Sequence, residues 1–384
     1  MAGGRATQVL ARHKARDREI VLVGDEPHRP YRRPPLSKQA LTEEPGNHLF
    51  LHPESYYDDN AVILKLSQRA AELAPANKTV VLDDGSSIRY SSLILAPGCA
   101  NRTLPVPGAG LPGVVYLRTL TESNELRRRL ATAQNVVVVG GGFIGTEIAA
   151  TCQTLGKKVT LVEAGSALLW SVLGHEIGEI VQRRHEKNGV EVLTGELVTE
   201  IEGDERVRAV RLRSGVSVAA DLVVVGIGVN PNTMWLESSG VRLDNGILVD
   251  NRCRTSVDDV YAAGDVARWT HPAFGSLRTE HEANAHQQAV IAARNAMGEE
   301  ITYDAVPYSW SDQAGLRLRY VGHAPVWDEA QIHAATFGGS LTVLYIWDGC
   351  VRAVFCLDDM DSFDRARQLF HRHGCFRPYL WTSA

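Results

Sequence analysis

The sequence has no long apolar segment, no secretory signal pattern and little net charge. Its most apolar runs are short and end at Gly or Asp, so none is long enough to cross a bilayer. Arg5, Arg12 and Lys14 interrupt the apolar core that a secretory signal requires. A net charge of −5 excludes a nucleic-acid binder that works through bulk positive charge. We therefore expect a cytoplasmic protein with no membrane and no nucleic acid among its partners.

The sequence also lacks closely spaced cysteines. Its six cysteines are scattered and include no C-x-x-C, which is typical of a reducing compartment where thiols are buried as small hydrophobic side chains. His371 and His373 lie near Cys375 and have the composition of a metal site, but no fourth ligand accompanies them. We therefore expect no metal, and no triad or carboxylate pair of a hydrolase stands out.

What is present is an ordinary globular composition and one strong motif. The chain has 384 residues, of which 44% are hydrophobic and 22% are charged. These values predict two or three domains with large cores.

Residues 136–163 match one complete unit for binding a dinucleotide. Val136–Val139 predict a buried parallel strand, a helix is expected over about 144–155, and Val159–Val162 predict a second strand. Between the first strand and the helix, glycines fill a G-x-G-x-x-G turn at Gly140, Gly142 and Gly145. The first allows the tight turn, the second lets a pyrophosphate approach the backbone, and the third allows close packing of helix on strand.

An acidic residue, Glu163, ends the second strand about 20 residues after the glycines, as a dinucleotide unit requires. Its carboxylate would accept a hydrogen bond from a ribose 2′-hydroxyl and repel a 2′-phosphate, so we expect NADH rather than NADPH. The alternative is a packing turn that holds no cofactor. The candidates for NAD binding are Gly140, Gly142, Phe143, Ile144, Gly145, Glu163 and Gly228.

A second unit of this kind is incomplete at the start of the chain. Ile20–Val23 predict a strand that leads to Glu26, and a helix is expected from Thr7 to about Lys14. Gly3 fits the third glycine of a G-x-G-x-x-G turn, but the first strand and the first two glycines are absent. Two explanations stay open: the start was assigned at an internal Met, or half of a phosphate-binding loop was lost.

Five further segments extend the pattern. They are PHRPYRRPPLSK at 27–38, LILAPG at 93–98, VVVGIGVNPN at 223–232, VYAAGD at 260–265 and VPYSWSDQ at 306–313. Together with the central motif, they resemble the ferredoxin and rubredoxin reductase branch of the FAD-dependent pyridine nucleotide-disulphide oxidoreductases, which includes putidaredoxin-reductase-like enzymes. The resemblance covers nearly the whole chain, to about Phe370.

The resemblance implies an α/β fold with two Rossmann-like dinucleotide-binding domains, the second inserted in the first, and a C-terminal α+β domain. The FAD-binding domain would comprise residues 1–106 and 232–304, the NADH-binding domain 107–231 and the C-terminal domain 305–384. Pro- and Gly-rich stretches at 105–113 and 230–232 support these seams independently. In the last domain, 341–347 and 351–357 predict a hairpin that turns at Asp348-Gly349.

The resemblance also implies roles around a flavin. Lys38 would lie beside the isoalloxazine with Glu147 holding it in place, and Trp310 would stack near the flavin rim. These three are the catalytic candidates. The FAD-binding candidates are Gly3, Glu26 for the ribose, Arg33 for the pyrophosphate, Lys38, Pro97, Gly98, Gly264, Asp265 for the ribityl chain, and Trp310.

Each of these residues also has a plainer interpretation. The basic loop around Arg33 is alternatively a solvated loop, Asp265 a turn residue, Trp310 a core aromatic, and Lys38 and Glu147 unpaired surface charges. Two residues depart from the family pattern: Pro97 replaces a Thr, and Glu282 replaces an aromatic that should lie against the flavin. A buried carboxylate there would be costly unless it is paired or protonated.

Two functions follow. The first is an NADH-dependent FAD oxidoreductase that passes electrons to a ferredoxin or rubredoxin-like carrier, because no C-x-x-C provides a disulfide relay. An acidic carrier would meet arginines 317, 319, 365, 367, 372 and 377, although residues 307–384 also hold eight acids. The second is a repurposed, flavin-poor family member with a non-redox or atypical role. The oligomeric state, monomer or homodimer, stays open.

Overall fold

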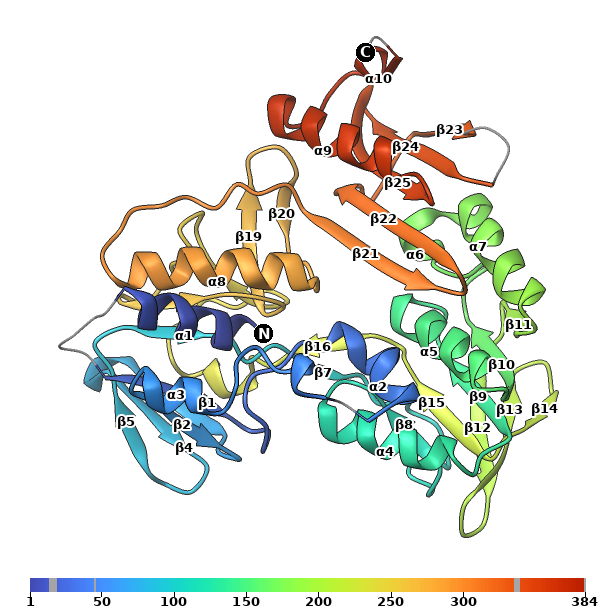
Figure 1. Cartoon of the computed structure of the whole chain (residues 1–384), viewed down its shortest axis with the longest axis horizontal. Coiled ribbons are helices and arrows are strands. Elements are labelled where there is room, and N and C mark those ends of the chain that lie inside the picture. Colours follow the sequence, from blue (N-terminus) through green and yellow to red (C-terminus); the bar gives the residue numbers. More distant parts are fainter. Residues whose placement is uncertain (14–18, 45, 335–338, 383–384) are drawn as a thin grey trace.

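The computed structural model describes residues 1–13, 19–44, 46–334 and 339–382. A parallel sheet lies near the middle of the chain, an antiparallel sheet near its end, and segments from the first hundred residues pack against residues 240–300 (Figure 1). Segments that precede and follow the central sheet in the sequence pair with each other. This is the topology that the predicted insertion of one unit in another requires. This arrangement is the α/β fold that was expected.

The central sheet is parallel and buried on both faces. In spatial order its strands are β11 (Glu191–Thr194), β10 (Lys158–Glu163), β9 (Asn135–Val139), β15 (Leu222–Val225) and β8 (Val114–Tyr116). Alternate valines of β9 face opposite cores because successive side chains of a strand point to opposite faces. Val136 and Val138 pack with Ile148, whereas Val137 and Val139 pack with Val210. Burial on both faces explains the unbroken apolar run.

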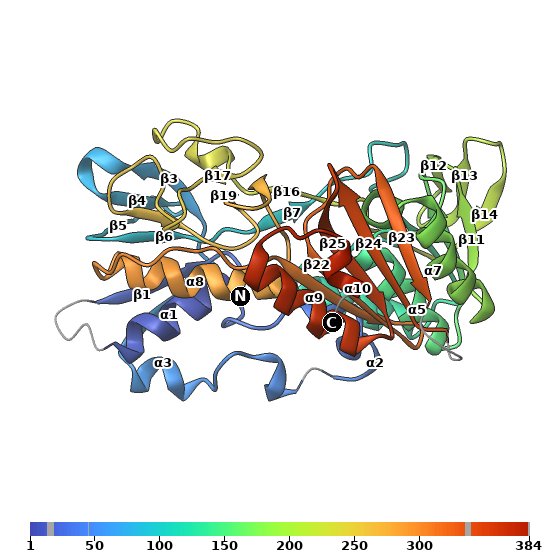
Figure 2. The same ribbon diagram turned by 90° about the horizontal axis from the view of Figure 1, so that it is seen from above.

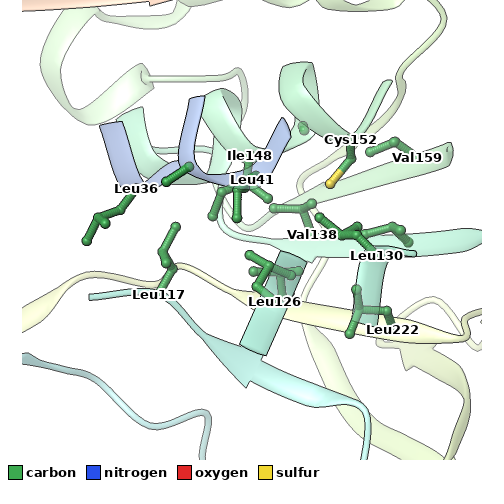
Figure 3. Packing of buried hydrophobic residues seen from close by; sticks show 14 of the residues in the cluster. Leu36, Leu41, Leu117, Leu126, Leu130, Val138, Ile148, Cys152, Val159 and Leu222 are labelled. Carbon is green, nitrogen blue, oxygen red and sulfur yellow. The ribbon is translucent and has the colours of Figure 1, made fainter. Parts of the chain in front are cut away.

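Helices cover one face of this sheet and a small antiparallel sheet covers the other. The helices on this face are α4 (Leu120–Leu130) and α5 (Phe143–Thr154), and the strands are β12 (Val198–Gly203), β13 (Val207–Leu212) and β14 (Ser217–Ala219). Two further helices, α6 (Trp170–Leu173) and α7 (His175–Lys187), pack their buried side chains against the C-terminal sheet, and α7 also contacts β11. Leu36 and Leu41, from far earlier in the chain, enter the same core as Leu126, Ile148 and Val138 (Figure 3). This packing fixes the segment that carries Lys38 against the central sheet.

The N-terminal part contains two parallel strand pairs. β1 (Ile20–Gly24) pairs with β2 (Val62–Leu66), and β6 (Leu93–Leu95) pairs with β18 (Val260–Ala262). Helix α1 (Ala2–Arg12) contacts β1 and β6 and lies beside α8 (Glu282–Ala296) (Figures 1 and 2). A segment from each end of the predicted FAD-binding domain therefore packs as one body.

The predicted start of the first helix at Thr7 was wrong, because α1 already begins at Ala2. Gly3 and Gly4 lie inside the helix and let it pack closely. A Cβ built on Gly4 would lie 2.4 Å from the Cβ of Pro30, and one on Gly3 would lie 3.3 Å from Leu22 Cδ1. The glycines thus serve close approach here, rather than marking chain outside the helix.

Smaller elements complete this part. They are η1 (Pro34–Ser37), α2 (Gln39–Thr42), η2 (Asn47–Leu49), α3 (Ser55–Asp59), β3 (Ala70–Ala74), η3 (Pro75–Asn77), β4 (Thr79–Leu82), β5 (Ser87–Arg89), η4 (Met234–Leu236), β17 (Ile247–Leu248), β19 (Ala267–His271) and β20 (Gly275–Leu277). An antiparallel pair, β7 (Cys99–Asn101) and β16 (Val229–Pro231), lies where the chain enters and leaves the central unit. The predicted domain bounds stay a prediction.

The last part is an antiparallel sheet of five strands. Its order is β21 (Tyr308–Gln313), β22 (Leu316–Gly322), β25 (Cys350–Leu357), β24 (Leu341–Trp347) and β23 (Glu329–Ala334), and helices α9 (Met360–His373) and α10 (Tyr379–Thr382) follow. The expected hairpin is confirmed as β24 and β25. Asp348 and Gly349 at its turn have φ of 52° and 64°, as the tight hairpin turn requires. No helix in the described ranges is long and apolar enough to span a membrane.

Candidate functional site: two nucleotide loops and a buried ion pair

Each glycine of the central motif has its own geometric setting. Gly140 has φ of +106°, and a Cβ there would lie 2.4 Å from the carbonyl oxygen of Gly226. A Cβ on Gly145 would lie 1.9 Å from the carbonyl oxygen of Gly140, so the helix packs directly on the turn. A Cβ on Gly142, at the N-cap of α5, would meet nothing within 4 Å. The second glycine is therefore the one that opens on free space, and Ile144 beside it is 46% exposed.

The carboxylate of Glu163 faces this loop. Its Oε2 accepts a hydrogen bond from Gly141 N at 2.5 Å, and its Oε1 accepts one from Gly165 N at 2.6 Å. The indole of Trp170 covers Gly165, because a Cβ there would lie 1.7 Å from Trp170 Nε1. Glu163 thus ties the glycine turn to the loop after β10.

The candidates for FAD binding converge at the N-terminus of α1. Arg33 bonds to Glu26 Oε1 at 2.8 Å and to the carbonyl oxygen of Arg118. Tyr31 donates its hydroxyl proton to Glu26 and accepts a hydrogen bond from Leu120 N at 2.9 Å. Burial raises the pKa of Tyr31, so the phenol remains a donor. These contacts hold Glu26 and Arg33 at one edge of the site.

A second ion pair lies next to the first, since Arg33 bonds to the backbone of Arg118. Arg118 Nη2 lies 2.5 Å from Asp265 Oδ2. Gly264, immediately before it, has φ of +85°, and a Cβ there would lie 3.0 Å from the Cβ of Ala2 at the start of α1. Gly98 has φ of +65°, and its Cβ would lie 3.5 Å from Arg118 Nη2, while Pro97 accepts a hydrogen bond from Asn232. The turns after β6 and β18 are therefore both adjacent to α1.

Lys38 and Glu147 form a third ion pair, at 2.6 Å between Nζ and Oε1. Glu147 lies one turn into α5 and is 5% exposed. Its Oε2 also accepts a hydrogen bond from Ser37 Oγ at 2.5 Å, and its Oε1 accepts one from Ser311 Oγ. The expected pairing of Lys38 with Glu147 is present, and these residues come from three separate parts of the fold.

Glu282 is paired rather than isolated. Arg32 binds it through two parallel bonds, Nε to Oε1 at 3.0 Å and Nη2 to Oε2 at 3.2 Å. This two-pronged geometry is the favoured one for a guanidinium and a carboxylate. The cost of burying an unpaired carboxylate, expected from the sequence, is thereby avoided.

Trp310 is half-buried on β21 and stacks on Tyr308, with 6.1 Å between ring centroids. Alternate residues of a strand face opposite sides, so Trp310 points away from the side on which Ser311 reaches Glu147. The structure therefore does not bring Trp310 into the contacts around Lys38 and Glu147. Its role beside a flavin stays a prediction.

Comparison with known proteins identifies the family. The model of the pyridine nucleotide-disulphide oxidoreductases matches residues 1–293, and the model of the reductase C-terminal domain matches residues 308–381. The chain belongs to the pyridine nucleotide-disulphide oxidoreductase family. A ferredoxin–NAD(P)(+) reductase from a Sphingomonas species is 35% identical over 98% of this chain and 92% of its own length. The ferredoxin–NAD(+) reductase component of the biphenyl dioxygenase system of Paraburkholderia xenovorans is 35% identical over 96% and 90%.

Solved structures of this oxidoreductase family agree. The ferredoxin reductase for the CYP199A2 system from Rhodopseudomonas palustris superposes with a TM-score of 0.90 at 35% identity, over 97% of this chain and 91% of that one. Putidaredoxin reductase, in a covalent complex with putidaredoxin, gives 0.91 at 30% identity, over 96% and 90%. The expected branch of the family is thereby confirmed, as is the expected α/β fold with its C-terminal domain.

The residues gathered around the N-terminus of α1 fit an FAD. Arg33 and Arg118 supply cationic donors for a pyrophosphate, and the backbone N–H groups at the start of α1 have no side-chain cap. Glu26 and Asp265 supply carboxylate acceptors for hydroxyl groups. Gly264 and Gly98, with positive φ, let the backbone pass close to Ala2 at the start of α1 and to Arg118. The donor set matches one anionic diphosphate flanked by sugar hydroxyls.

Several residues of these contacts escaped sequence reasoning. They are Tyr31, Ser37, Arg118 and Ser311. Gln313 and His185 were missed as well: Gln313 Nε2 donates a hydrogen bond to Ser311 Oγ, and Gln313 Oε1 lies 3.1 Å from His185 Nε2. Ser311 and Gln313 lie in the segment that was singled out for Trp310, on the alternate positions of its strand. The period of two along 308–313 was the available signal, because it separates the residues that face Glu147 from those that do not.

Proposed function

We propose that the protein is an NADH-dependent FAD oxidoreductase that passes electrons from NADH to a ferredoxin or rubredoxin-type carrier. The observation that carries this is the Lys38–Glu147 pair, at 2.6 Å and with Glu147 5% exposed, between two loops suited to dinucleotides. An ion pair that only stabilised the surface would not need to be buried between two such loops. The full-length similarity to ferredoxin reductases supports the choice of acceptor, and no observation favours the flavin-poor alternative.

Each residue group has one task. Bound FAD supplies the chemistry that converts a two-electron hydride into single electrons. Arg33, Arg118 and the N-terminus of α1 hold its diphosphate, Gly142 admits that of NADH, and Glu163 orients the adenosine ribose. Glu147 keeps Lys38 fixed, so that its ammonium would be held in one position beside a bound flavin. Burial excludes water around this pair, which strengthens its field.

The acceptor is external to the chain. All six cysteines are free, and burial raises the pKa of Cys99, Cys152, Cys253 and Cys356 to about 12. These thiols therefore remain protonated and cannot act as thiolate nucleophiles. We propose that single electrons leave to an iron–sulfur carrier, as the names of the related reductases suggest for those proteins. Scattered free thiols also support a cytoplasmic location.

The arginines near the C-terminus are largely engaged within the chain. Arg319 lies 2.7 Å from Asp312, Arg317 lies 3.6 Å from Asp358, and Arg367 lies over the ring of Tyr308 at 4.9 Å. We propose that a carrier meets this surface through local contacts, since these partners neutralise much of the positive charge.

An anaerobic titration tests the function. The protein, purified with FAD in excess and then desalted, should retain a yellow flavin spectrum that NADH bleaches. Adding oxidised ferredoxin should restore the spectrum as the carrier is reduced. A protein that folds but retains no FAD, or whose flavin NADH does not bleach, would refute the proposal. NADPH in place of NADH is the matched control and should act far more slowly.

A further inference from the structure

The carboxylate of Glu147 is the end of a buried chain of hydrogen bonds that begins on α7. His185 Nε2 lies 3.1 Å from Gln313 Oε1, Gln313 Nε2 donates to Ser311 Oγ at 3.0 Å, and Ser311 Oγ donates to Glu147 Oε1. His185 and Ser311 are fully buried, and Gln313 is 6% exposed. Because these side chains are buried away from water, they have few alternative hydrogen-bond partners.

The hydrogen bonds of this series all run in one direction, from His185 toward Glu147. A proton on His185 Nδ1 would be a buried donor without an acceptor among the described residues, whereas Nε2 lies 3.1 Å from the side-chain amide of Gln313. Burial lowers the pKa of His185 to about 4, which makes the ring neutral, and its Nδ1 atom has no hydrogen-bond partner in the described part of the chain. The proton therefore sits on Nε2. This fixes Gln313 with its amide N–H toward Ser311.

The same logic fixes the Ser311 hydroxyl. Because Ser311 Oγ already accepts a proton from Gln313, its own proton is free to point at Glu147. If the Gln313 amide were reversed, its oxygen would face Ser311 and compete with Glu147 for that proton. The tautomer of a histidine on α7 thus decides that Glu147 receives a donor.

The chain also connects three parts of the molecule. Glu147 belongs to α5 and His185 to α7 of the central unit, whereas Ser311 and Gln313 belong to β21 of the C-terminal sheet, which packs against α5 (Figure 1). Ser37 and Lys38 come from the N-terminal part: Ser37 donates to Oε2 of Glu147, and Lys38 lies 2.6 Å from Oε1, the oxygen that also accepts from Ser311. Both carboxylate oxygens are therefore engaged.

We propose that Ser311, Gln313 and His185 are positioning residues, which hold Glu147 and thereby Lys38 in the geometry that hydride transfer from NADH requires. This inference rests on the proposed function and adds residues that do not touch the reacting atoms. They act through Glu147, so their loss should slow the chemical step more than it weakens NADH binding.

Stopped-flow reduction of the FAD-loaded protein by NADH tests the inference. In Ser311→Ala, the limiting rate of flavin reduction should fall at least about tenfold, while the apparent Kd for NADH changes less than about twofold. Ser311→Thr, which keeps a hydroxyl, should recover most of the rate. Ser309→Ala is the matched control: Ser309 is 6% exposed on the same face of β21 and should leave the rate unchanged.

His185 provides an independent break in the chain. His185→Phe keeps an aromatic ring but has no donor, so Gln313 is no longer oriented and the rate should fall as in Ser311→Ala. His185→Gln offers an amide N–H toward Gln313 and should restore it. If one of these variants does not fold, Gln313→Leu breaks the chain at its middle and carries the test.

A second readout uses the protein without cofactor or NADH. Lys38 is 18% exposed in its ion pair, so acetic anhydride should label it slowly. Mass spectrometry should show faster acetylation of Lys38 in Ser311→Ala and His185→Phe, by at least about threefold, because a mobile Glu147 holds the ammonium less firmly. Ser309→Ala should be labelled like the wild type, and Lys78, paired on the surface with Asp259, should react equally in all variants.

The outcomes separate the two proposals. If NADH does not reduce the wild-type flavin, the proposed function fails, whatever the variants do. If NADH reduces the wild type and Ser311→Ala at equal rates, or if Lys38 is labelled equally in both, the positioning role is refuted while the function stands.

Discussion

At the scale of single residues, the main charged groups of the candidate site are carboxylates that each accept hydrogen bonds from several donors. Glu163, Glu147 and Glu26 each accept at least two hydrogen bonds within the chain. Bonds to a charged acceptor are worth roughly 1.5–3 kcal/mol each, about twice a neutral bond. Such carboxylates keep a fixed orientation, which is what recognition of a sugar or a lysine requires.

Glu163 provides the first prediction. Glu163→Arg should raise the KM for NADH about tenfold or more and lower that for NADPH, because a phosphate donor replaces a ribose acceptor. Steady-state kinetics with both cofactors check this. Glu196→Arg makes the same charge change at a residue of the neighbouring loop and should leave the preference for NADH intact. Unchanged constants for both cofactors in Glu163→Arg would contradict the assignment.

At this scale, the sequence suggested which residues form the candidate site but not all of their partners. Glu163 was identified because the glycine motif and its acid have a known spacing, and Lys38 was identified from the family resemblance. The pairing of Glu282 with Arg32 was not anticipated, because the two residues are 250 positions apart and no local pattern connects them. Because Arg32 pairs with Glu282, this departure from the family pattern is compatible with the site.

At the scale of elements, two glycines in the turn between β9 and α5 have different surroundings. A side chain on Gly145 collides with the Gly140 carbonyl, while one on Gly142 meets open space. Both positions are glycine, yet only one is needed for the fold.

This difference predicts opposite phenotypes for two similar substitutions. Gly142→Val should keep the melting temperature within a few degrees while NADH no longer reduces the flavin at normal concentrations, because the side chain fills the pyrophosphate space. Gly145→Val should lower the melting temperature strongly or prevent folding, because the clash is with backbone. Thermal unfolding and NADH titration of both variants measure this. Normal NADH affinity in folded Gly142→Val would show that this loop does not bind the nucleotide.

Elements were predicted well where the pattern was strong. The strands β9 and β10, the helix α5 and the β24–β25 hairpin were all placed within one or two residues. The start of α1 was missed, because glycine has poor helix propensity and Gly3 and Gly4 lie in its first turn. Tertiary contact with Pro30 and Leu22 outweighs that propensity.

At the scale of the whole molecule, three parts of the chain meet at one carboxylate. α7 and β21 are joined there by the buried His185–Gln313 bond. Stability and chemistry are therefore coupled: anything that charges His185 disrupts a contact between the central unit and the C-terminal sheet.

This coupling predicts the acid stability of the protein. Burial lowers the pKa of His185 from its ordinary 6.5 to about 4 in the folded state. The unfolded state then binds more protons between these values, so the stability due to neutral His185 is complete above 6.5 and is lost as the pH falls toward 4. The melting temperature should decline over this window, and less steeply in His185→Gln, which keeps a donor and does not titrate. Equal slopes for the two proteins would show that His185 is not the group responsible.

The sequence by itself determined the α/β class, the dinucleotide loop, the family and the chemistry of the expected cofactors. These depend on local periods and short spacings: glycines within six positions, valines buried on both faces of a strand, and an acid about 20 residues on. Only the tertiary structure decided which polar and charged side chains pair with one another. Arg118 with Asp265, Arg32 with Glu282 and His185 with Glu147 through two side chains are separated by tens to hundreds of residues. Contacts of that kind exist only after packing, so they leave no spacing in the chain from which to predict them.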